Sequence, residues 1–328
     1  MAASRKRRGI AYRLDGAHQG AMIATLLSIL AQAAAAQASG RAAPDPVSPA
    51  EVAASASASE WVTIPAEELL VMRLPAARGG EPRQVVIQLI PAPFARPWVA
   101  NIRSLAGARW WDGTSVNRVQ DNYVVQWGDA SEKKPLPAIL SVAAEKDYSV
   151  GASVFSAAEL APGPADVYAA ATMFYRGWPV AADAPGTVSR QVWPVHCYGT
   201  VGVGRDVSPN TGTGAELYAV IGHAPRHLDR NIAVVGRVVE GMEHLSSLPR
   251  GTLGLGFYER AEQRVPVTSL RLASDLPKGE RPRFQYLATN GPTWARYAAA
   301  RANRHDSFFI RPAGAADICN IPVPIRRQ

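Results

Sequence analysis

Short runs of β-branched and aromatic residues, separated by turn-forming residues, recur along most of this chain. Residues 69–74 (LLVMRL) and 83–90 (RQVVIQLI) are two such runs, and the intervening PAARGGEP predicts a hairpin turn between them. Six further strands are expected, at about residues 115–119, 122–127, 196–204, 216–222, 232–239 and 265–273. The chain is therefore expected to be built mainly from β-strands.

Helical patterns are fewer. In ARPWVANIRSLAGA, apolar residues recur at helical spacing, a proline stands in the first turn and a glycine lies near the end. These apolar residues are Trp98, Val99, Ile102 and Leu105. PTWARYAAARAN, residues 292–303, predicts a second helix. Because strands far outnumber helices, and the 26 prolines and 27 glycines favour turns, we expect a closed or nearly closed antiparallel barrel.

Residues 1–38 have the pattern of an export signal. A basic stretch precedes the apolar run AMIATLLSILAQAAAA, and small residues that suit signal cleavage follow it. A transmembrane anchor is the alternative, but it needs about 20 continuous apolar residues, and Gln32 and Gln37 interrupt this run. Translation from Met22 and a twin-arginine signal at Arg7-Arg8 also remain open. We expect a cleaved signal and a periplasmic or secreted product.

Residues 39–328 fall into three regions that differ in composition. A chain of 328 residues suits one large domain or two small ones. Residues 39–60 are rich in alanine, serine and proline and predict a flexible linker. Residues 61–275 are expected to form the folded domain, in which 130–195 is an alanine- and proline-rich insertion with a helix at SAAELAPGPADVYAAATMFYRG. Residues 276–328 are expected to form a C-terminal extension packed on the barrel.

The net charge of +8 does not indicate a nucleic-acid-binding protein. The first 38 residues hold five basic residues and one acidic residue, which leaves 30 basic and 26 acidic residues elsewhere. The remaining arginines are scattered, whereas phosphate binding requires a clustered basic face. We therefore expect no nucleic-acid partner.

Several segments resemble catalytic motifs only superficially. GTVGVGRD has the glycines of a nucleotide loop, but no helix can open in the RDVSPNTGTG that follows. His223 and His227 are four positions apart, but Pro225 between them excludes the helix that would direct both at a metal. We expect no metal and no cofactor. An enzyme of this kind needs a reaction without covalent or metal chemistry.

Cis-trans isomerisation of a prolyl peptide bond is such a reaction. Its barrier is about 18–20 kcal/mol because the C–N bond has partial double-bond character. A catalyst needs an apolar socket for the proline ring and a donor aimed at the proline nitrogen. An arginine beside an aromatic pocket supplies both, because it stabilises charge that exists only in the twisted transition state.

Two sets of motifs resemble the cyclophilin family of peptidyl-prolyl isomerases. VVIQL, VANIRSLA and WWDGTSVNRVQDNYVVQWGD resemble its first half, and SPNTGTGAELYAVIG with RHLDRNIAVVGRVVEGM resembles its second half. The resemblance covers roughly residues 84–245, with 130–195 unmatched. It implies an eight-stranded antiparallel barrel capped by two helices, and proline-containing peptides or unfolded exported proteins as partners of a monomer.

The resemblance also implies a site. Arg118 matches the catalytic arginine, and Gln126 matches the glutamine that holds the substrate backbone. The expected pocket residues are Tyr123, Val124, Tyr218, Leu228 and His227. The residues alone, without the resemblance, favour Arg118 as a surface ion-pair partner, the tyrosines as barrel core and Gln126 as a solvated strand residue.

The chain departs from the family pattern at several positions, among them Val116 in place of a phenylalanine. Asn117 stands where the family usually has histidine, Glu216 where it has glutamine, and Asp206 near a loop asparagine. His227 takes the place of a pocket tryptophan or phenylalanine. We expect the two carboxylates to be able to pair with Arg118 and hold it from substrate. The alternative function is therefore a weakly catalytic chaperone or a module that binds peptides or an envelope partner.

The two cysteines, Cys197 and Cys319, are expected to form a structural disulfide. An export signal places both where disulfides persist, and a bridge would fix the C-terminal tail to the barrel. Two buried free thiols, which behave as small apolar residues, are the alternative.

Overall fold

The computed structural model describes residues 47–76 and 80–328. The predicted signal segment lies outside these residues, as does the first part of the predicted linker. Within the described part of the chain, no helix has the length and apolarity needed to cross a membrane.

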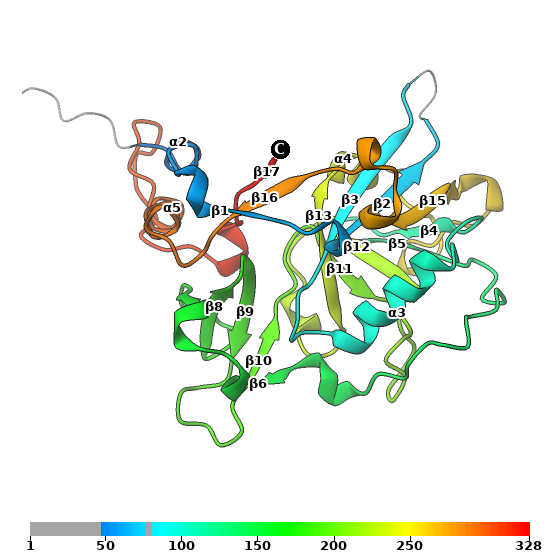
Figure 1. The fold of residues 1–328 in the computed structure, drawn as a ribbon, viewed down its shortest axis with the longest axis horizontal. Helices are drawn as coiled ribbons and strands as arrows, with labels where there is room; N and C mark the ends of the chain where they lie inside the picture. The colour runs from blue at the N-terminus through cyan, green and yellow to red at the C-terminus, as the bar shows by residue number, and fades with distance from the viewer. Residues whose placement is uncertain (1–46, 77–79) are drawn as a thin grey trace, which may run out of the picture. The chain divides into compact units, whose positions relative to one another are not determined.

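A nine-stranded antiparallel sheet forms the main body of the fold (Figure 1). Its strands, in spatial order, are β14 (Val265–Pro266), β4 (Ser115–Val119), β5 (Val124–Gly128), β12 (Leu217–Val220), β11 (Thr200–Val203), β13 (Val234–Glu240), β3 (Arg83–Leu89), β2 (Leu69–Leu74) and β15 (Ser269–Leu272). The β2–β3 hairpin and the other predicted strands are confirmed, with ends shifted by a few residues.

The sheet curls until its two edge strands meet. β14 and β15 stand at opposite ends of the strand order, yet only Val267 and Thr268 separate them. The Val267 amide donates to the Thr114 carbonyl, and the Thr268 amide to the Arg73 carbonyl, both at 2.9 Å. The prediction of a nearly closed, mainly β barrel is confirmed. The strand count is nine rather than eight because the predicted strand 265–273 divides at this bend.

Two helices accompany the sheet, α3 (Arg96–Gly107) and the short α4 (Met242–Ser246). The predicted helical spacing is confirmed in α3, where Trp98, Ile102 and Leu105 are fully buried in the core. They pack with the face of the sheet that carries Val125, Trp127 and similar residues. The opposite face of β4, β5 and β12 is left for the site.

Residues 150–194 form a second, five-stranded sheet. Its strands, in spatial order, are β6 (Val150–Gly151), β10 (Gln191–Pro194), β9 (Trp178–Ala182), β8 (Ala171–Tyr175) and β7 (Leu160–Pro162). The prediction of a helix in residues 156–177 is therefore wrong. ATMFY and WPVAA pair as a hairpin across Arg176 and Gly177, which both have positive φ (47° and 79°) as the tight hairpin turn requires. Tertiary pairing overrides the helix propensity of the alanines.

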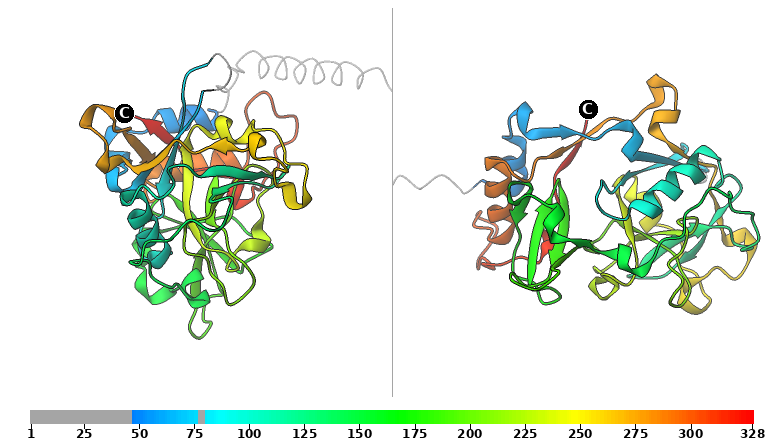
Figure 2. Two further views of the ribbon diagram at one scale, coloured as in Figure 1. Left: turned by 90° about the vertical axis from the view of Figure 1, so that its right-hand side faces the viewer. Right: turned by 60° about the horizontal axis from the view of Figure 1, so that its bottom comes forward.

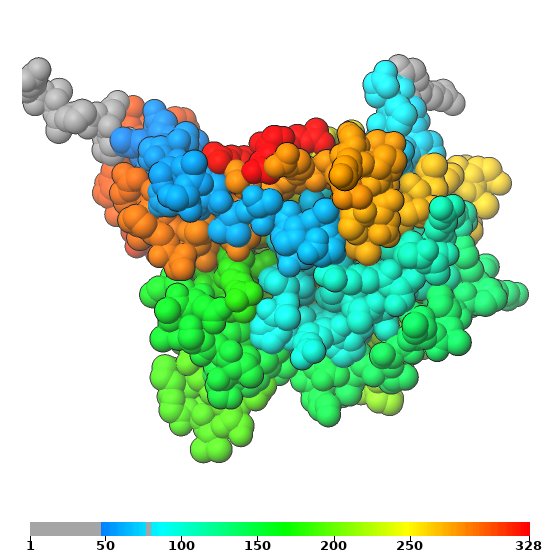
Figure 3. All heavy atoms as spheres, viewed as in Figure 1, coloured from blue at the N-terminus to red at the C-terminus, as the bar shows by residue number. Residues whose placement is uncertain are grey.

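The N-terminal and C-terminal segments of the described chain lie side by side (Figures 2 and 3). A three-stranded sheet joins β1 (Trp61–Thr63), β16 (Phe284–Leu287) and β17 (Ile325–Arg327), and α2 (Pro49–Ala54) contacts α5 (Pro292–Ala302). The predicted flexible linker is thus replaced by structure from residue 49. Ser48 and Glu51 form a capping box that starts α2.

The C-terminal extension packs on both larger sheets. Trp294 of α5 meets Phe174 edge-on, with ring centroids 4.7 Å apart, in the five-stranded sheet. Phe284 of β16 lies in a cluster with Val71 and Val86 of the nine-stranded sheet. The predicted contact with the barrel is therefore present, together with one to the second sheet. Short 3₁₀ helices fill the connections: η1 (Ala58–Glu60), η2 (Ala66–Glu68), η3 (Glu145–Tyr148), η4 (Ala152–Val154), η5 (Ala157–Glu159), η6 (Arg226–Leu228), η7 (Gly254–Gly256), η8 (Ala261–Gln263), η9 (Ala273–Asp275), η10 (Lys278–Glu280) and η11 (Ile318–Asn320).

Candidate active site

Arg118, Gln126 and Tyr218 stand in a row across three neighbouring strands. Arg118 on β4 lies opposite Gln126 on β5, and Gln126 lies opposite Tyr218 on β12. Residues directly opposite in antiparallel strands share a face of the sheet, with Cβ atoms about 4.5–5.5 Å apart. A β-bulge at Asn117 precedes Arg118, and the buried Asn117 side chain donates to the Gly128 carbonyl (3.3 Å). Register thus places the three side chains together.

The guanidinium of Arg118 is held in place by three acceptors. Its Nε donates to the Leu255 carbonyl (2.6 Å), one Nη donates to Gln126 Oε1 (3.2 Å), and the other Nη donates to Gln120 Oε1. The rings of Tyr123 and Phe257 lie 5.8 and 5.5 Å from the guanidinium carbon. Burial lowers the pKa of Arg118, but a guanidinium in a protein keeps its charge.

An apolar socket lies beside this arginine. Val124, Tyr218 and Val220 are buried at its base, and Leu228 and Ile232 pack against them together with Tyr123. The socket opens into a cavity of about 1070 Å³, which Arg118 and Gln126 also line. This volume is sufficient for a peptide segment, since ligand pockets commonly measure about 300–1,000 Å³.

Glu216 lies in the same cavity, next to Gln126. Its carboxyl group occupies the space above Gly128, where an added Cβ would lie only 1.8 Å from a carboxylate oxygen. Burial raises the pKa of Glu216 to about 7, although the Asp129 amide and the Gln126 side chain lower it. The group therefore changes charge near neutral pH.

Tyr218 turns its hydroxyl away from the socket. An added Cβ on Gly202 would lie 2.3 Å from this hydroxyl, so the glycine leaves the room that the phenol occupies. The hydroxyl reaches the fully buried His196, whose Nε2 is 2.9 Å away. Burial raises the pKa of Tyr218 well above its ordinary value, so the phenol stays neutral.

Six of the seven predicted catalytic and pocket residues line the cavity: Arg118, Tyr123, Val124, Gln126, Tyr218 and Leu228. The seventh, His227, is exposed and stacks against Tyr123, with ring centroids 6.3 Å apart. The expected pairing of Arg118 with new carboxylates is absent from the described residues. Glu216 faces Gln126 instead, and the Asp206 carboxylate accepts from the Val207 amide (2.7 Å).

Sequence reasoning missed the loop that completes the site. Leu255 supplies the carbonyl that holds Arg118 Nε, and it has a left-handed backbone (φ 60°) that is uncommon for leucine. Phe257 forms a bridge with Arg118 and lines the cavity. No periodic pattern in the sequence marks a loop 137 positions from the residue that it contacts.

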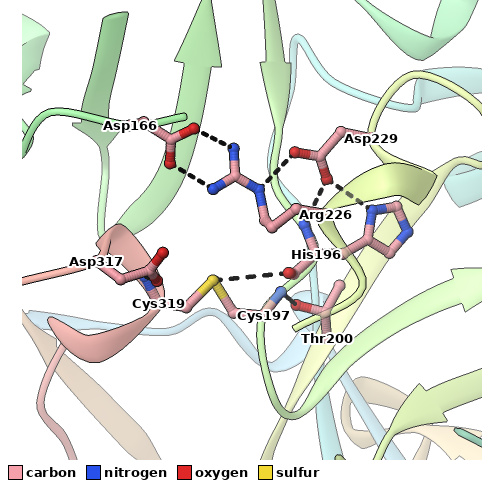
Figure 4. Close-up of a disulfide and its surroundings, with 8 residues drawn as sticks. All are labelled: Asp166, His196, Cys197, Thr200, Arg226, Asp229, Asp317 and Cys319. Carbon is pink, nitrogen blue, oxygen red and sulfur yellow. Dashed lines mark hydrogen bonds and ion pairs between the residues drawn. A yellow bond between two sulfur atoms is a disulfide. The ribbon is translucent and has the colours of Figure 1, made fainter. Parts of the chain in front are cut away.

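Cys197 and Cys319 form a disulfide, the pairing expected from the sequence (Figure 4). The bridge fastens η11 of the C-terminal extension to the segment that follows β10. It lies next to His196, whose carbonyl oxygen is 3.6 Å from the Cys319 sulfur. The disulfide is thus a neighbour of the residues behind the socket rather than part of the cavity.

A curled antiparallel sheet thus carries an arginine at the edge of an apolar socket. The family model described as "Cyclophilin type peptidyl-prolyl cis-trans isomerase/CLD" matches residues 85–272, more than half of the chain. The chain therefore belongs to this family and is a peptidyl-prolyl cis-trans isomerase. No curated protein sequence matches it.

A solved structure shows the same fold. The chain is similar to the cyclophilin AquaCyp293 from Hirschia baltica, with a TM-score of 0.63 and 23% identity over 81% of this chain and 93% of that one. A cyclophilin type isomerase from Cryptosporidium parvum, crystallised in the presence of the dipeptide Ala-Pro, matches with a TM-score of 0.35 and 10% identity, over 62% of this chain and 98% of that one.

Proposed function

We propose that this chain isomerises prolyl bonds in exported proteins and that Arg118 assists the reaction. The observation that carries the proposal is the row of Arg118, Gln126 and Tyr218 beside the apolar socket. The socket takes the proline ring, and the row places hydrogen-bonding groups along the peptide that enters it.

Arg118 acts on charge that develops as the prolyl bond twists. Twisting breaks amide resonance, so the nitrogen lone pair becomes localised and can accept a hydrogen bond. A guanidinium has five N–H groups, and three of those on Arg118 donate to protein acceptors. Two remain for the twisted nitrogen. A donor fixed in advance stabilises the transition state without reorganisation.

Gln126 and the socket position the substrate. Gln126 Oε1 accepts from Arg118, so the amide nitrogen of Gln126, which lies beside Glu216, is the group that donates to a substrate carbonyl. Burying the proline ring against Val124, Tyr218 and Leu228 favours binding by roughly 25 cal/mol per Å² of apolar surface. The reaction needs no covalent intermediate, because rotation about one bond is the whole chemical change.

We place the enzyme in the periplasm or outside the cell. The basic and apolar pattern of residues 1–38 supports this location, and so does the Cys197–Cys319 disulfide, because disulfides persist in oxidising compartments. Fractionation of cells that express the full chain, with mass measurement of the mature N-terminus, tests it. An uncleaved chain in the cytoplasm contradicts the proposal.

A protease-coupled assay on a proline tetrapeptide tests the activity. The parent enzyme should accelerate the cis-to-trans step in proportion to its concentration. The alternative, a binding module with little catalysis, predicts that the same peptide binds without acceleration. Isothermal titration with the peptide, carried out in parallel, separates these two outcomes.

A further inference from the structure

A chain of buried polar side chains runs from the socket wall toward the five-stranded sheet. The Tyr218 hydroxyl meets His196 Nε2 at 2.9 Å, and His196 Nδ1 meets Asp229 Oδ1 at 3.0 Å. The backbone amide of His196 donates to the same Asp229 oxygen at 2.9 Å. Asp229 therefore fixes both the ring and the backbone of the histidine.

The series of hydrogen-bonded side chains continues through Arg226, as Figure 4 shows. Arg226 Nε donates to Asp229 Oδ2 at 2.7 Å, and its two Nη atoms donate to the oxygens of Asp166 at 2.5 and 3.2 Å. Asp166 lies between β7 and β8 of the five-stranded sheet. The side chains of Arg226 and Asp166 are only 2% and 1% exposed. These two buried side chains must remain paired, because breaking the ion pair would leave a buried charge without a partner and strongly destabilise the fold.

The hydrogen-bond pattern determines which nitrogen of His196 carries the proton. A carboxylate only accepts, so His196 carries its proton on Nδ1 and donates it to Asp229. In the neutral ring, Nε2 then accepts the proton of the Tyr218 hydroxyl. This bond holds the Tyr218 phenol over Gly202 and fixes the ring that forms one wall of the socket.

The same residues also hold a second wall. Leu228 packs against Tyr218 and Val124 in the socket, and it belongs to η6 (Arg226–Leu228). Arg226 begins this turn and Asp229 follows it, and the two are bonded to each other. Both ends of the short turn that carries Leu228 are therefore anchored in the buried chain.

We propose that the four polar residues behind the socket are positioning residues for isomerisation, so that the five-stranded sheet becomes part of the active site. They are His196, Asp229, Arg226 and Asp166. They contact no substrate and act through Tyr218 and Leu228. The inference rests on the proposed function of the socket.

The test compares matched substitutions in the full mature chain. Asp166→Asn keeps the shape of the side chain but removes the charge that Arg226 binds. Arg226→Lys keeps a cation between the carboxylates but cannot hold both of them, and it serves if Asp166→Asn does not fold. Glu159→Gln is the control, since it breaks an ion pair with Arg176 that is confined to the same insertion. Thermal unfolding of each variant shows that it is folded at the assay temperature.

Two readouts are taken. The chain is labelled with fluorotyrosine, and Tyr218→Phe identifies the fluorine resonance of Tyr218 among those of the other tyrosines. We expect Asp166→Asn and Arg226→Lys to shift this resonance and to lower kcat/KM about tenfold, as small displacements at a reacting centre do. Glu159→Gln should leave both readouts unchanged.

A folded Asp166→Asn or Arg226→Lys variant with kcat/KM within about twofold of the parent, a difference of less than half a kcal/mol in the barrier, overturns the proposal. A parent enzyme without turnover overturns the proposed function instead. In that case the Tyr218 resonance alone decides whether the four residues hold the socket wall.

Discussion

Glu216 should make both stability and activity depend on pH near neutrality. Its pKa rises from an ordinary 4.5 to about 7, with burial as the main cause. The negative charges of Asp129 and Glu132, which also line the cavity, raise the pKa further. Between these two pH values the folded chain holds a proton that the unfolded chain has released. Raising the pH through this range therefore removes stability.

The magnitude follows from the size of the shift. At about 1.4 kcal/mol for each pH unit, the ionised form of Glu216 costs the folded state about 3 kcal/mol. The Glu216→Gln variant has no carboxyl group to ionise at this position, so it does not lose this stability. We expect it to exceed the stability of the parent by less than about 1 kcal/mol near pH 5 and by about 3 kcal/mol near pH 8.5.

Urea unfolding at both pH values measures this difference directly. Glu262→Gln is the control, because Glu262 is exposed and is not one of the residues that line the cavity. Its difference from the parent should be the same at both pH values. The reasoning is refuted if the stability gain of Glu216→Gln does not grow between pH 5 and pH 8.5.

The ionisation of Glu216 should also change the rate of isomerisation. Ionised Glu216 attracts the amide nitrogen of Gln126, which the proposed function assigns to the substrate carbonyl. Turnover by the parent should therefore fall as the pH rises through about 7, and Glu216→Gln should keep a flat profile. A parent profile that stays level across this range contradicts the assigned role of Gln126.

Three further outcomes are expected. Gly202→Ala should lower kcat/KM, because the new Cβ would displace Tyr218. Gly107→Ala is the control, because its new Cβ meets nothing within 4 Å. Equal activity of the two variants would contradict the role of Tyr218 as a wall of the socket. Cys319→Ser should lower the free energy of unfolding by about 4 kcal/mol, since the lost bridge closes a loop of 122 positions; an unchanged urea midpoint contradicts this. Cyclosporin should inhibit weakly in the peptide assay, because the exposed His227 offers less apolar area than the tryptophan of many relatives; inhibition as tight as theirs contradicts it.

The sequence predicts the barrel well because local pattern and tertiary structure agree there. Nearly continuous apolar runs predict β2 and β3, and the helical spacing of Trp98, Ile102 and Leu105 is realised in α3. The insertion is different. Its alanines favour a helix locally, but Tyr175 and Trp178 pair across a hairpin and are buried by packing that no local pattern reveals.

The residues of the site also fall into a group that the sequence predicts and a group that it does not. Arg118, Gln126 and Tyr218 could be predicted because strand register brings residues of ordered motifs together. The hydrogen-bonded residues behind the socket could not, because His196 and Asp229 are 33 positions apart and no local pattern pairs them, although Asp229 lies within RHLDRNIAVVGRVVEGM. Contacts of this kind exist only after the whole chain has folded.

The loss of Arg118 tests the central claim most directly. Arg118→Ala should fold like the parent and lower kcat/KM by about 100-fold, the usual effect of removing one preorganised donor. Arg73→Ala is the control, because Arg73 is also a strand arginine of the same sheet but pairs with Glu280 at 2.6 Å. The account predicts that only Arg118→Ala loses activity. Isomerisation by Arg118→Ala at the rate of the parent would contradict it.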